Sequence, residues 1–148
     1  MTRGKVPWEV LEHTADTGIV VRAGSLPELF ERAAAAMFDA MVDLDTVEPR
    51  GEAEEVSVLA PDRETLLVAW LSELLSRAEA EGRLYGEFDV RELGGSGDGW
   101  RLVARVRGEP VDPSRHAFAL EIKAVTYHLL EVREEAPGRW VARVLFDI

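Results

Sequence analysis

Residues 62–82 constrain the fold most strongly, because their apolar side chains recur at the spacing of one helical face. The stripe consists of Leu67, Trp70, Leu71, Leu74, Leu75 and Ala78. Such spacing is typical of an amphipathic helix that buries one side. Asp62, after Pro61, can accept hydrogen bonds from the first free backbone N–H groups, and Gly82 ends the pattern. The sequence therefore predicts a helix between Asp62 and Gly82 that must pack against another apolar layer.

A second helix is predicted from residue 26 to about Val42. Ser25 can cap this helix, Glu28 can complete a capping box, and Pro27 is compatible with a first turn. The apolar side chains that follow at helical spacing are Leu26, Leu29, Phe30, Ala33, Met37, Ala40 and Met41. This helix should therefore also present one apolar face to a core.

The remaining apolar runs indicate strands, because hydrophobic and polar residues alternate in them or because β-branched and aromatic residues are frequent. We expect strands over residues 6–11, 18–23, 54–60, 84–93, 100–108, 117–133 and 140–146. The glycine-rich residues 94–99 predict a hairpin turn, and Pro137 with Gly138 predicts another. Residues 12–17, 43–50 and 109–115 are interpreted as connections.

These elements predict the fold class. A length of 148 residues and a hydrophobic content of 47% suit one domain with a substantial core, so we expect a single domain over residues 1–148. Two amphipathic helices among about seven strands, each strand with one polar face, predict an α+β fold. We expect a two-layer sandwich in which both helices pack on one face of a mixed, largely antiparallel sheet.

The composition limits the partners. A formal net charge of −11 opposes broad affinity for nucleic-acid backbones, which clustered Lys and Arg side chains provide. We therefore expect no strong direct nucleic-acid binding and favour a positively charged protein or a metal ion as partner. Cysteine is absent, so thiol chemistry and thiolate zinc sites are excluded. No stretch has the apolar length of a signal peptide or a membrane span, and we expect a cytoplasmic protein without membrane contact.

Carboxylates stand next to predicted strands at both ends of the chain. Asp16 precedes one strand, and the last strand is followed by Asp147 and the α-carboxylate of Ile148. If the fold brings Asp16 beside this end, three carboxylates share a small volume and must take up protons, stay hydrated or bind a cation. A local interpretation stays open, because Asp16 with Thr17 and Gly18 suits an ordinary turn, and the last two residues suit a frayed end.

Lys123 is one of two lysines in a chain with fifteen arginines. Its ammonium could lie near the carboxylates, or its stem could lie on the sheet with the amine in water, which is the commoner arrangement. His128 is interpreted as a half-buried strand residue and His116 as part of a polar loop. The sequence shows no Ser-His-Asp pattern and no paired-histidine metal spacing.

Several motifs occur in an order that resembles the archease family. They are residues 13–19 (HTADTGI), 24–26 (GSL) with 29–30 (LF), 66–71 (LLVAWL), 108–109 (GE), 121–128 (EIKAVTYH) and 146–148 (FDI). The resemblance spans nearly the whole chain, with a mild departure at Thr17, where the family pattern favours an apolar residue. It implies a small, acidic, non-enzymatic cofactor of an RtcB-type RNA ligase, which promotes guanylylation and multiple turnover of the ligase in tRNA splicing and RNA repair.

The resemblance also implies site residues. The family's metal ligands map onto Asp16, Asp147 and Ile148, with His13 and Lys123 at or near the same ligase-activation pocket. Calcium is the first expectation for the divalent ion, and magnesium or manganese are alternatives because all of them accept oxygen ligands.

A different functional class stays open on the same residues. A small divalent-metal-dependent hydrolase would use Asp16 and Asp147 to hold an ion that activates water. The sequence offers no evident nucleophile, general base or basic groove to accompany these carboxylates, which favours the non-enzymatic interpretation. A metal-stabilised binding module with another partner is a third interpretation.

Overall fold

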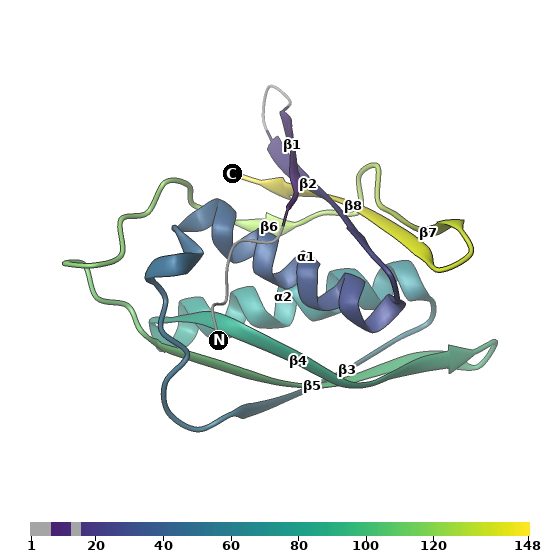
Figure 1. Cartoon of the computed structure of the whole chain (residues 1–148), viewed down its shortest axis with the longest axis horizontal. Helices are drawn as coiled ribbons and strands as arrows, with labels where there is room; N and C mark the ends of the chain where they lie inside the picture. The colour runs from purple at the N-terminus through teal and green to yellow at the C-terminus, as the bar shows by residue number, and fades with distance from the viewer. Residues whose placement is uncertain (1–6, 13–15) are drawn as a thin grey trace.

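The computed structural model describes residues 7–12 and 16–148 (Figure 1). The elements in this part of the chain are β1 (Glu9–Glu12), β2 (Asp16–Ala23), α1 (Leu26–Met41), the 3-10 helix η1 (Leu44–Thr46), β3 (Glu54–Ala60), α2 (Arg63–Glu81), β4 (Arg83–Ser96), β5 (Gly99–Pro110), β6 (Ala124–Val125), β7 (Glu131–Ala136) and β8 (Arg139–Asp147). The predicted helices and the strand over residues 54–60 are confirmed. Gly82 ends α2 in the left-handed conformation, with a φ of 62°.

The described strands form two antiparallel sheets, and α1 and α2 lie between them (Figure 1). In the first sheet, β2 lies between β1 and β8, and both β6 and β7 pair with the other edge of β8. In the second sheet, β5 lies between β3 and β4. The α+β class and the packing of both helices on largely antiparallel strands are confirmed. The layering differs from the expected single sheet, because the helices are covered on both sides.

The burial of α1 explains this layering. Residues 33–38 are all buried, so this stretch has neighbours on every side. A helix on one open sheet would instead expose a polar stripe to water. α1 contacts β2 in the first sheet and β4 in the second, while α2 contacts β3 and also β6. Trp70 Nε1 donates a hydrogen bond to the Phe30 carbonyl oxygen at 2.9 Å and joins the two helices.

Both helix starts show the expected capping. Ser25 Oγ accepts a hydrogen bond from the Glu28 N–H at 3.4 Å, and Asp62 Oδ1 accepts one from the Thr65 N–H at 2.7 Å. The second bond of the expected capping box differs in its donor, because Glu28 Oε1 accepts from the Gly24 N–H at 3.3 Å. These local bonds satisfy backbone N–H groups that have no partner inside the helix.

The strand predicted over residues 117–133 is mostly wrong. Only residues 124–125 and 131–133 of this range lie in strands, which belong to β6 and β7. β-Branched and aromatic residues extend into a strand only where a neighbouring edge is free to pair with them. Here that edge belongs to β8, which pairs with β6 near its end and with β7 further back, and residues 126–130 leave the sheet between them.

The predicted hairpin connections are shorter than expected. Glu12 pairs with Thr17, so β1 and β2 continue into the predicted link over residues 12–17. In the second sheet, β4 continues to Ser96 and β5 begins at Gly99, inside the predicted turn over residues 94–99. The longer ladders satisfy backbone groups that a longer loop would leave to water.

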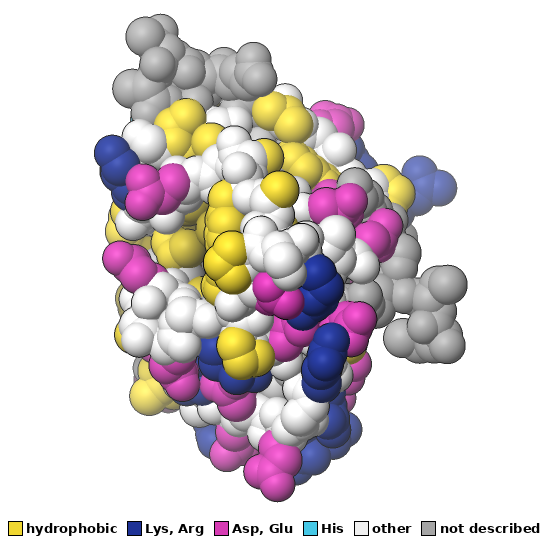
Figure 2. Space-filling model, turned by 90° about the vertical axis from the view of Figure 1, so that its left-hand side faces the viewer, with side chains coloured by type: hydrophobic (Ala, Val, Ile, Leu, Met, Phe, Trp, Pro, Cys, Tyr) yellow, Lys and Arg dark blue, Asp and Glu magenta, His cyan; other side chains and the backbone are white. Residues whose placement is uncertain are grey.

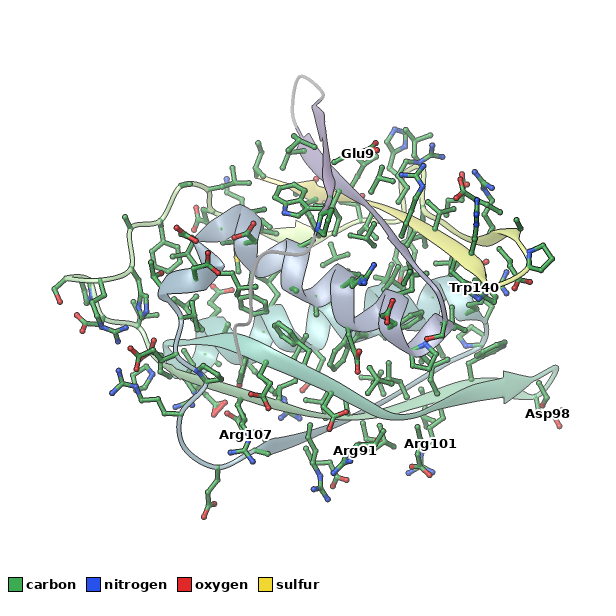
Figure 3. The ribbon with its side chains drawn as sticks, in the orientation of Figure 1. Glu9, Arg91, Asp98, Arg101, Arg107 and Trp140 are labelled. Carbon is green, nitrogen blue, oxygen red and sulfur yellow. The ribbon has the colours of Figure 1, made fainter. Side chains whose placement is uncertain are left out.

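The outer face of the second sheet is charged and solvated. Arg91, Arg101 and Arg107 point away from the helices on this side (Figure 3). Arg91 pairs with Asp89 at 3.4 Å, and Arg107 pairs with Glu87 at 3.6 Å. Exposed pairs of this kind contribute about 0–1 kcal/mol each, so they do not determine the fold.

No helix in the described part of the chain is long and apolar enough to cross a membrane.

β2 and β8 approach each other closely at Gly18, which lies opposite Leu145. A Cβ atom at this position would lie 2.5 Å from the Val144 carbonyl oxygen and 2.9 Å from Leu145 Cδ2. Because a backbone oxygen cannot move away without displacing its strand, the close approach requires glycine. The same register places Asp16 opposite Asp147.

Gly18→Ala should therefore lower the free energy of unfolding by about 1–3 kcal/mol, the usual cost of forcing an extra methyl group into a packed interior. Gly97→Ala is the matched control, because a Cβ atom at Gly97 meets nothing within 4 Å, and it should change stability by less than about 0.5 kcal/mol. Urea unfolding of the three proteins measures the difference. Equal midpoints for Gly18→Ala and the parent would contradict the close packing of β2 on β8.

Candidate functional site

The ends of β2 and β8 bring two acidic positions together. Asp16, the first residue of β2, lies opposite Asp147, the last residue of β8. The expectation that the chain end meets Asp16 therefore agrees with the strand register. The side chain of Asp16 lies outside the described residues, so its part in a metal site stays a prediction.

The segment before β6 reaches the same place from the other edge of β8. Ala124 lies opposite Asp147, and the Lys123 N–H donates a hydrogen bond to the Asp147 carbonyl oxygen at 2.8 Å. Lys123, Asp147 and Ile148 are all exposed, and 42% of the surface of Ile148 is accessible. We call the positions Asp16, Lys123, Asp147 and Ile148 the terminal corner. Three segments that are distant in sequence meet there.

The terminal corner is attached to a firmly packed strand. Val144, Leu145 and Phe146 are each 0% exposed, although they directly precede the exposed Asp147. Because consecutive side chains of a strand point to opposite faces, both faces of β8 are covered here. The backbone of Asp147 is therefore fixed in the sheet, and the interpretation of this end as frayed is wrong for Asp147.

Other predicted polar residues lie elsewhere or outside the described part. His13 lies outside the described residues. His128 is exposed and lies in no strand, so the interpretation of His128 as a half-buried strand residue is wrong; its N–H donates to Thr126 Oγ1 at 3.3 Å. Among the described side chains, no group of three or more His, Cys, Asp or Glu residues is arranged to hold a metal ion. Two groups of the predicted ligand set are not among these side chains: the Asp16 carboxylate, which lies outside the described residues, and the α-carboxylate of Ile148.

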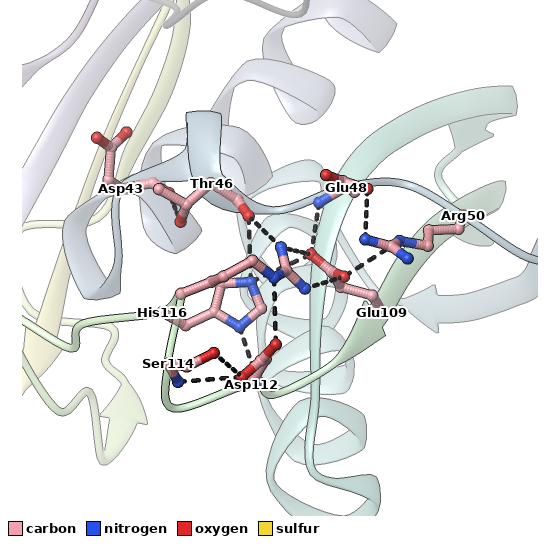
Figure 4. Close-up of polar contacts among 9 residues, drawn as sticks. Asp43, Thr46, Glu48, Arg50, Glu109, Asp112, Ser114 and His116 are labelled. Atoms are coloured by element: carbon pink, nitrogen blue, oxygen red, sulfur yellow. Dashed lines mark hydrogen bonds and ion pairs between the residues drawn. The ribbon is translucent and has the colours of Figure 1, made fainter.

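A second polar cluster surrounds Glu109, whose exposed fraction is only 3% (Figure 4). Arg115 donates to Glu109 Oε1 at 2.6 Å and to Oε2 at 3.2 Å, and the Glu48 N–H donates to Oε2 at 2.7 Å. Arg50 Nε lies 3.4 Å from Oε1. His116 Nε2 lies 3.1 Å from Oε2. Each carboxylate oxygen therefore has at least two partners, which joins the connection after α1 to the loop after β5.

The tautomer of His116 follows from its neighbours. Its Nδ1 accepts a hydrogen bond from the Asp112 N–H at 2.9 Å, so the ring proton must be on Nε2. Nε2 then donates toward Glu109 Oε2 and the Thr46 carbonyl oxygen, each at 3.1 Å. The buried His116 ring therefore lies between a backbone donor and two oxygen acceptors. The sequence did not reveal this role, because Thr46 lies 70 residues from His116 and reaches it only after folding.

The Glu109 cluster is structural. Burial raises the pKa of Glu109, but the hydrogen bonds from Arg115, the Glu48 N–H and His116 lower this pKa by a larger amount. The resulting pKa is about 2. A carboxylate that is ionised, buried and already saturated with donors has no oxygen available for a ligand. The Glu109 cluster therefore fastens loops together and does not resemble the exposed terminal corner.

An apolar pocket of about 400 Å³ lies on the side of the molecule where α1 and α2 end, a face on which hydrophobic side chains gather (Figure 2). Its charged lining residues are Glu79, Arg83 and Glu121. Its apolar lining residues are Met41, Leu75, Ala78, Leu84, Val111, Phe118, Leu120 and Ile122. Because most of these lining side chains are apolar, the pocket suits contact with an apolar group.

Fold and site together define a class: a small acidic α+β protein in which helices lie between antiparallel sheets and an exposed, carboxylate-bearing corner is built from strand ends. A family model described as the archease protein family (MTH1598/TM1083) matches residues 8–148 of this chain. The chain belongs to the archease family.

Individual relatives agree with this assignment. The archease of Methanopyrus kandleri is 45% identical over 143 residues, which are 97% of this chain and 100% of the relative. The archease of Thermococcus gammatolerans is 41% identical, over 95% of this chain and 98% of the relative. The solution structure of protein 1598 of Methanobacterium thermoautotrophicum is 36% identical, with a TM-score of 0.81 over 95% of this chain and 98% of the other.

A more distant structure supports the fold alone. It is the crystal structure of an archease, described as a possible chaperone, from Thermotoga maritima. It is 20% identical to this chain, with a TM-score of 0.55, and the match covers 95% of this chain and 96% of the other.

The depressed pKa of Glu109 predicts a loss of stability in acid. Stabilisation by a carboxylate with a lowered pKa is complete above its unfolded value of 4.5 and disappears as the pH falls toward about 2. The free energy of unfolding should fall by about 3 kcal/mol across this window on account of Glu109. Glu109→Gln should be several kcal/mol less stable than the parent at pH 7, since it leaves Arg115 without its charged partner, and the difference should shrink toward pH 2.

Urea unfolding at pH 7, 5, 3 and 2 measures this difference. Glu52→Gln is the control, because Glu52 is exposed, and its stability should follow that of the parent at every pH. A constant difference between Glu109→Gln and the parent across the series would contradict the ionised state of buried Glu109.

Proposed function

We propose that this archease is a non-enzymatic cofactor of an RtcB-type RNA ligase, and that it promotes guanylylation and multiple turnover of the ligase in tRNA splicing and RNA repair. Family membership supports this proposal. The observation that carries it is the register of β2 on β8, which sets Asp16 opposite Asp147 beside the exposed end of the chain. The protein would act through this corner on its partner, without completing a reaction by itself.

A divalent cation is part of the proposal, with calcium as the first expectation and magnesium or manganese as alternatives. The donors offered by the terminal corner are the carboxylate of Asp147, the α-carboxylate of Ile148 and, in the proposal, the carboxylate of Asp16. Directly opposite residues of an antiparallel pair have Cβ atoms about 4.5–5.5 Å apart, which allows two carboxylates to share one ion. Hard divalent ions bind such oxygen sets, so the residues fit the group. The ion would neutralise the carboxylates and offer coordination positions to an oxygen of the partner.

Lys123 and His13 complete the proposed ligase-activation pocket. The backbone of Lys123 is fixed to Asp147 by the 2.8 Å hydrogen bond, so its exposed side chain starts from the terminal corner itself. An ammonium at this position can balance the carboxylates or contact an anionic group of the partner. His13 belongs to the same sequence motif as Asp16.

The charge of the chain suits a protein partner. With a net charge of −11, the protein is repelled by a phosphate backbone and attracted to a basic protein surface. We therefore propose that the RNA is bound by the ligase and that this archease contacts the ligase in the cytoplasm.

A titration tests the proposed function. Added in substoichiometric amounts to its cognate ligase with GTP and manganese, the protein should raise the guanylylated fraction of the ligase and the number of joining events per ligase. Asp16→Asn keeps the size of the side chain but removes its charge, and it should reduce this stimulation by roughly 10–100-fold, as expected when a metal environment is disturbed. Radiolabelled guanylylation and gel-based RNA joining provide the measurements.

Asp98→Asn is the matched control, because Asp98 is an exposed aspartate at the tip of the β4–β5 hairpin, away from the chain end (Figure 3). It should stimulate as the parent does. Joining that stays unchanged across the whole titration would contradict the proposal. Hydrolysis of a phosphate ester by the protein alone, lost in Asp16→Asn, would instead favour the metal-dependent hydrolase.

A C-terminal extension tests the terminal ligand. Adding a few residues after Ile148 converts its α-carboxylate into a neutral amide carbonyl, so calcium or manganese binding should weaken by about tenfold or more and stimulation should fall. The fold should be retained, because Ile148 is exposed and follows the last strand. Calorimetry of metal binding compares this form with one extended before Met1, which should bind as the parent does. Equal affinities would show that Ile148 is not a ligand.

A further inference from the structure

Residues 126–130 form an exposed turn between β6 and β7. Val125 lies opposite Phe146 and Glu131 lies opposite Arg143, so the residues between them leave the edge of β8. Tyr127 is 63% exposed and Leu129 is 45% exposed, although both are large and apolar. We call residues 126–130 the β6–β7 turn.

The β6–β7 turn is held by hydrogen bonds at both ends. The Thr126 N–H and Oγ1 donate to the Leu145 carbonyl oxygen at 2.9 and 3.0 Å. Across the turn, the Leu130 N–H donates to the Tyr127 carbonyl oxygen at 3.3 Å. Arg143 Nε donates to the Leu129 carbonyl oxygen at 2.8 Å. The backbone is therefore fixed while the side chains of Tyr127 and Leu129 remain in contact with water.

Leu129 has a φ of 54°, and it is the one non-glycine residue with positive φ in the described part of the chain. This left-handed conformation brings the Cβ atom close to backbone oxygen and is unfavourable for leucine, whereas glycine or asparagine tolerates it. Leu130 packs against the core, but Leu129 does not. The fold thus gains little from a leucine at this position, and strained residues of this kind concentrate at functional sites.

We propose that Tyr127 and Leu129 are apolar anchors by which a partner protein docks beside the terminal corner. The proposal rests on the proposed function and names the surface that holds the ligase. Arg143 and Asp147 stand four residues apart on β8, a separation of about 13 Å at the rise of a strand, so one partner can cover both regions. The partner needs an apolar cleft for Tyr127 and Leu129 and a basic or metal-holding patch that faces Asp147.

The chemistry favours a protein as the occupant. A net charge of −11 opposes docking on RNA or on an anionic membrane, and no basic cluster accompanies the two apolar side chains within the turn. Aromatic residues are enriched at the centres of protein interfaces, where a few anchors supply most of the binding energy. A rigid turn also reduces the ordering that binding would otherwise require.

The decisive variant is Leu129→Gly. Relief of the backbone strain should raise stability, whereas loss of the leucine side chain should weaken binding. It should raise the melting temperature by about 2–4 °C and weaken binding to the cognate ligase by about tenfold. Tyr127→Ser should weaken binding similarly with an unchanged melting temperature. Leu59→Ser is the control: Leu59 is 73% exposed on β3 of the second sheet, and its variant should bind and stimulate as the parent does.

Calorimetric titration of the ligase, together with the guanylylation assay, separates the outcomes. If the parent binds and stimulates, and Leu129→Gly and Tyr127→Ser bind as tightly as the parent, the docking surface is wrong and the proposed function stands. A lowered melting temperature in Leu129→Gly, with a parallel loss of binding, would assign Leu129 a structural role and also overturn the inference. If the parent neither binds nor stimulates, the proposed function fails, and the docking surface fails with it.

Discussion

The pairing of β8 with β2 is the constraint on which the rest of the structure depends. It joins the two ends of the chain, from Asp16 opposite Asp147 to Ala23 opposite Trp140. Closing so long a loop has an entropic cost, which burial along β8 offsets. The other edge of β8 then receives β6 and β7, so one strand organises the first sheet and also presents the terminal corner.

Two carboxylates in this fold differ sharply in burial and in the number of their partners. Glu109 is 3% exposed and accepts hydrogen bonds from Arg115, His116 and the Glu48 N–H. Removing one of these donors would weaken the compensation of a buried charge, so each of them contributes to holding the loops together. Asp147 is exposed, so its carboxylate is accessible to water. The fold thus fixes the backbone of the terminal corner through buried neighbours and leaves the acidic side chain of Asp147 accessible.

The sequence predicted what depends on neighbouring residues and missed what depends on distant ones. Ser25 and Asp62 cap the helices as expected, because a cap needs only the next few residues. The single sheet was wrong because α1 packs on β4 of the second sheet as well as on β2, and periodicity does not reveal this second contact. The sequence raised the meeting of Asp16 with the chain end only as a condition, and the register of β2 on β8 places the two opposite each other. The contact of Glu109 with the Glu48 N–H could not be found, since Glu48 lies 61 residues away.

The β6–β7 turn departs from the conformation that its residues favour locally. Residues 125–127 are valine, threonine and tyrosine, which prefer strands, and a continuous strand would pair with β8 without a left-handed leucine. The chain instead leaves the ladder after Val125, turns through Leu129 and returns at Glu131. Departures from local preference that the core does not require concentrate where a protein meets something else. In this archease the β6–β7 turn lies along the edge of β8, the strand that also ends in the terminal corner. Both regions are exposed, and both are attached to the buried part of β8.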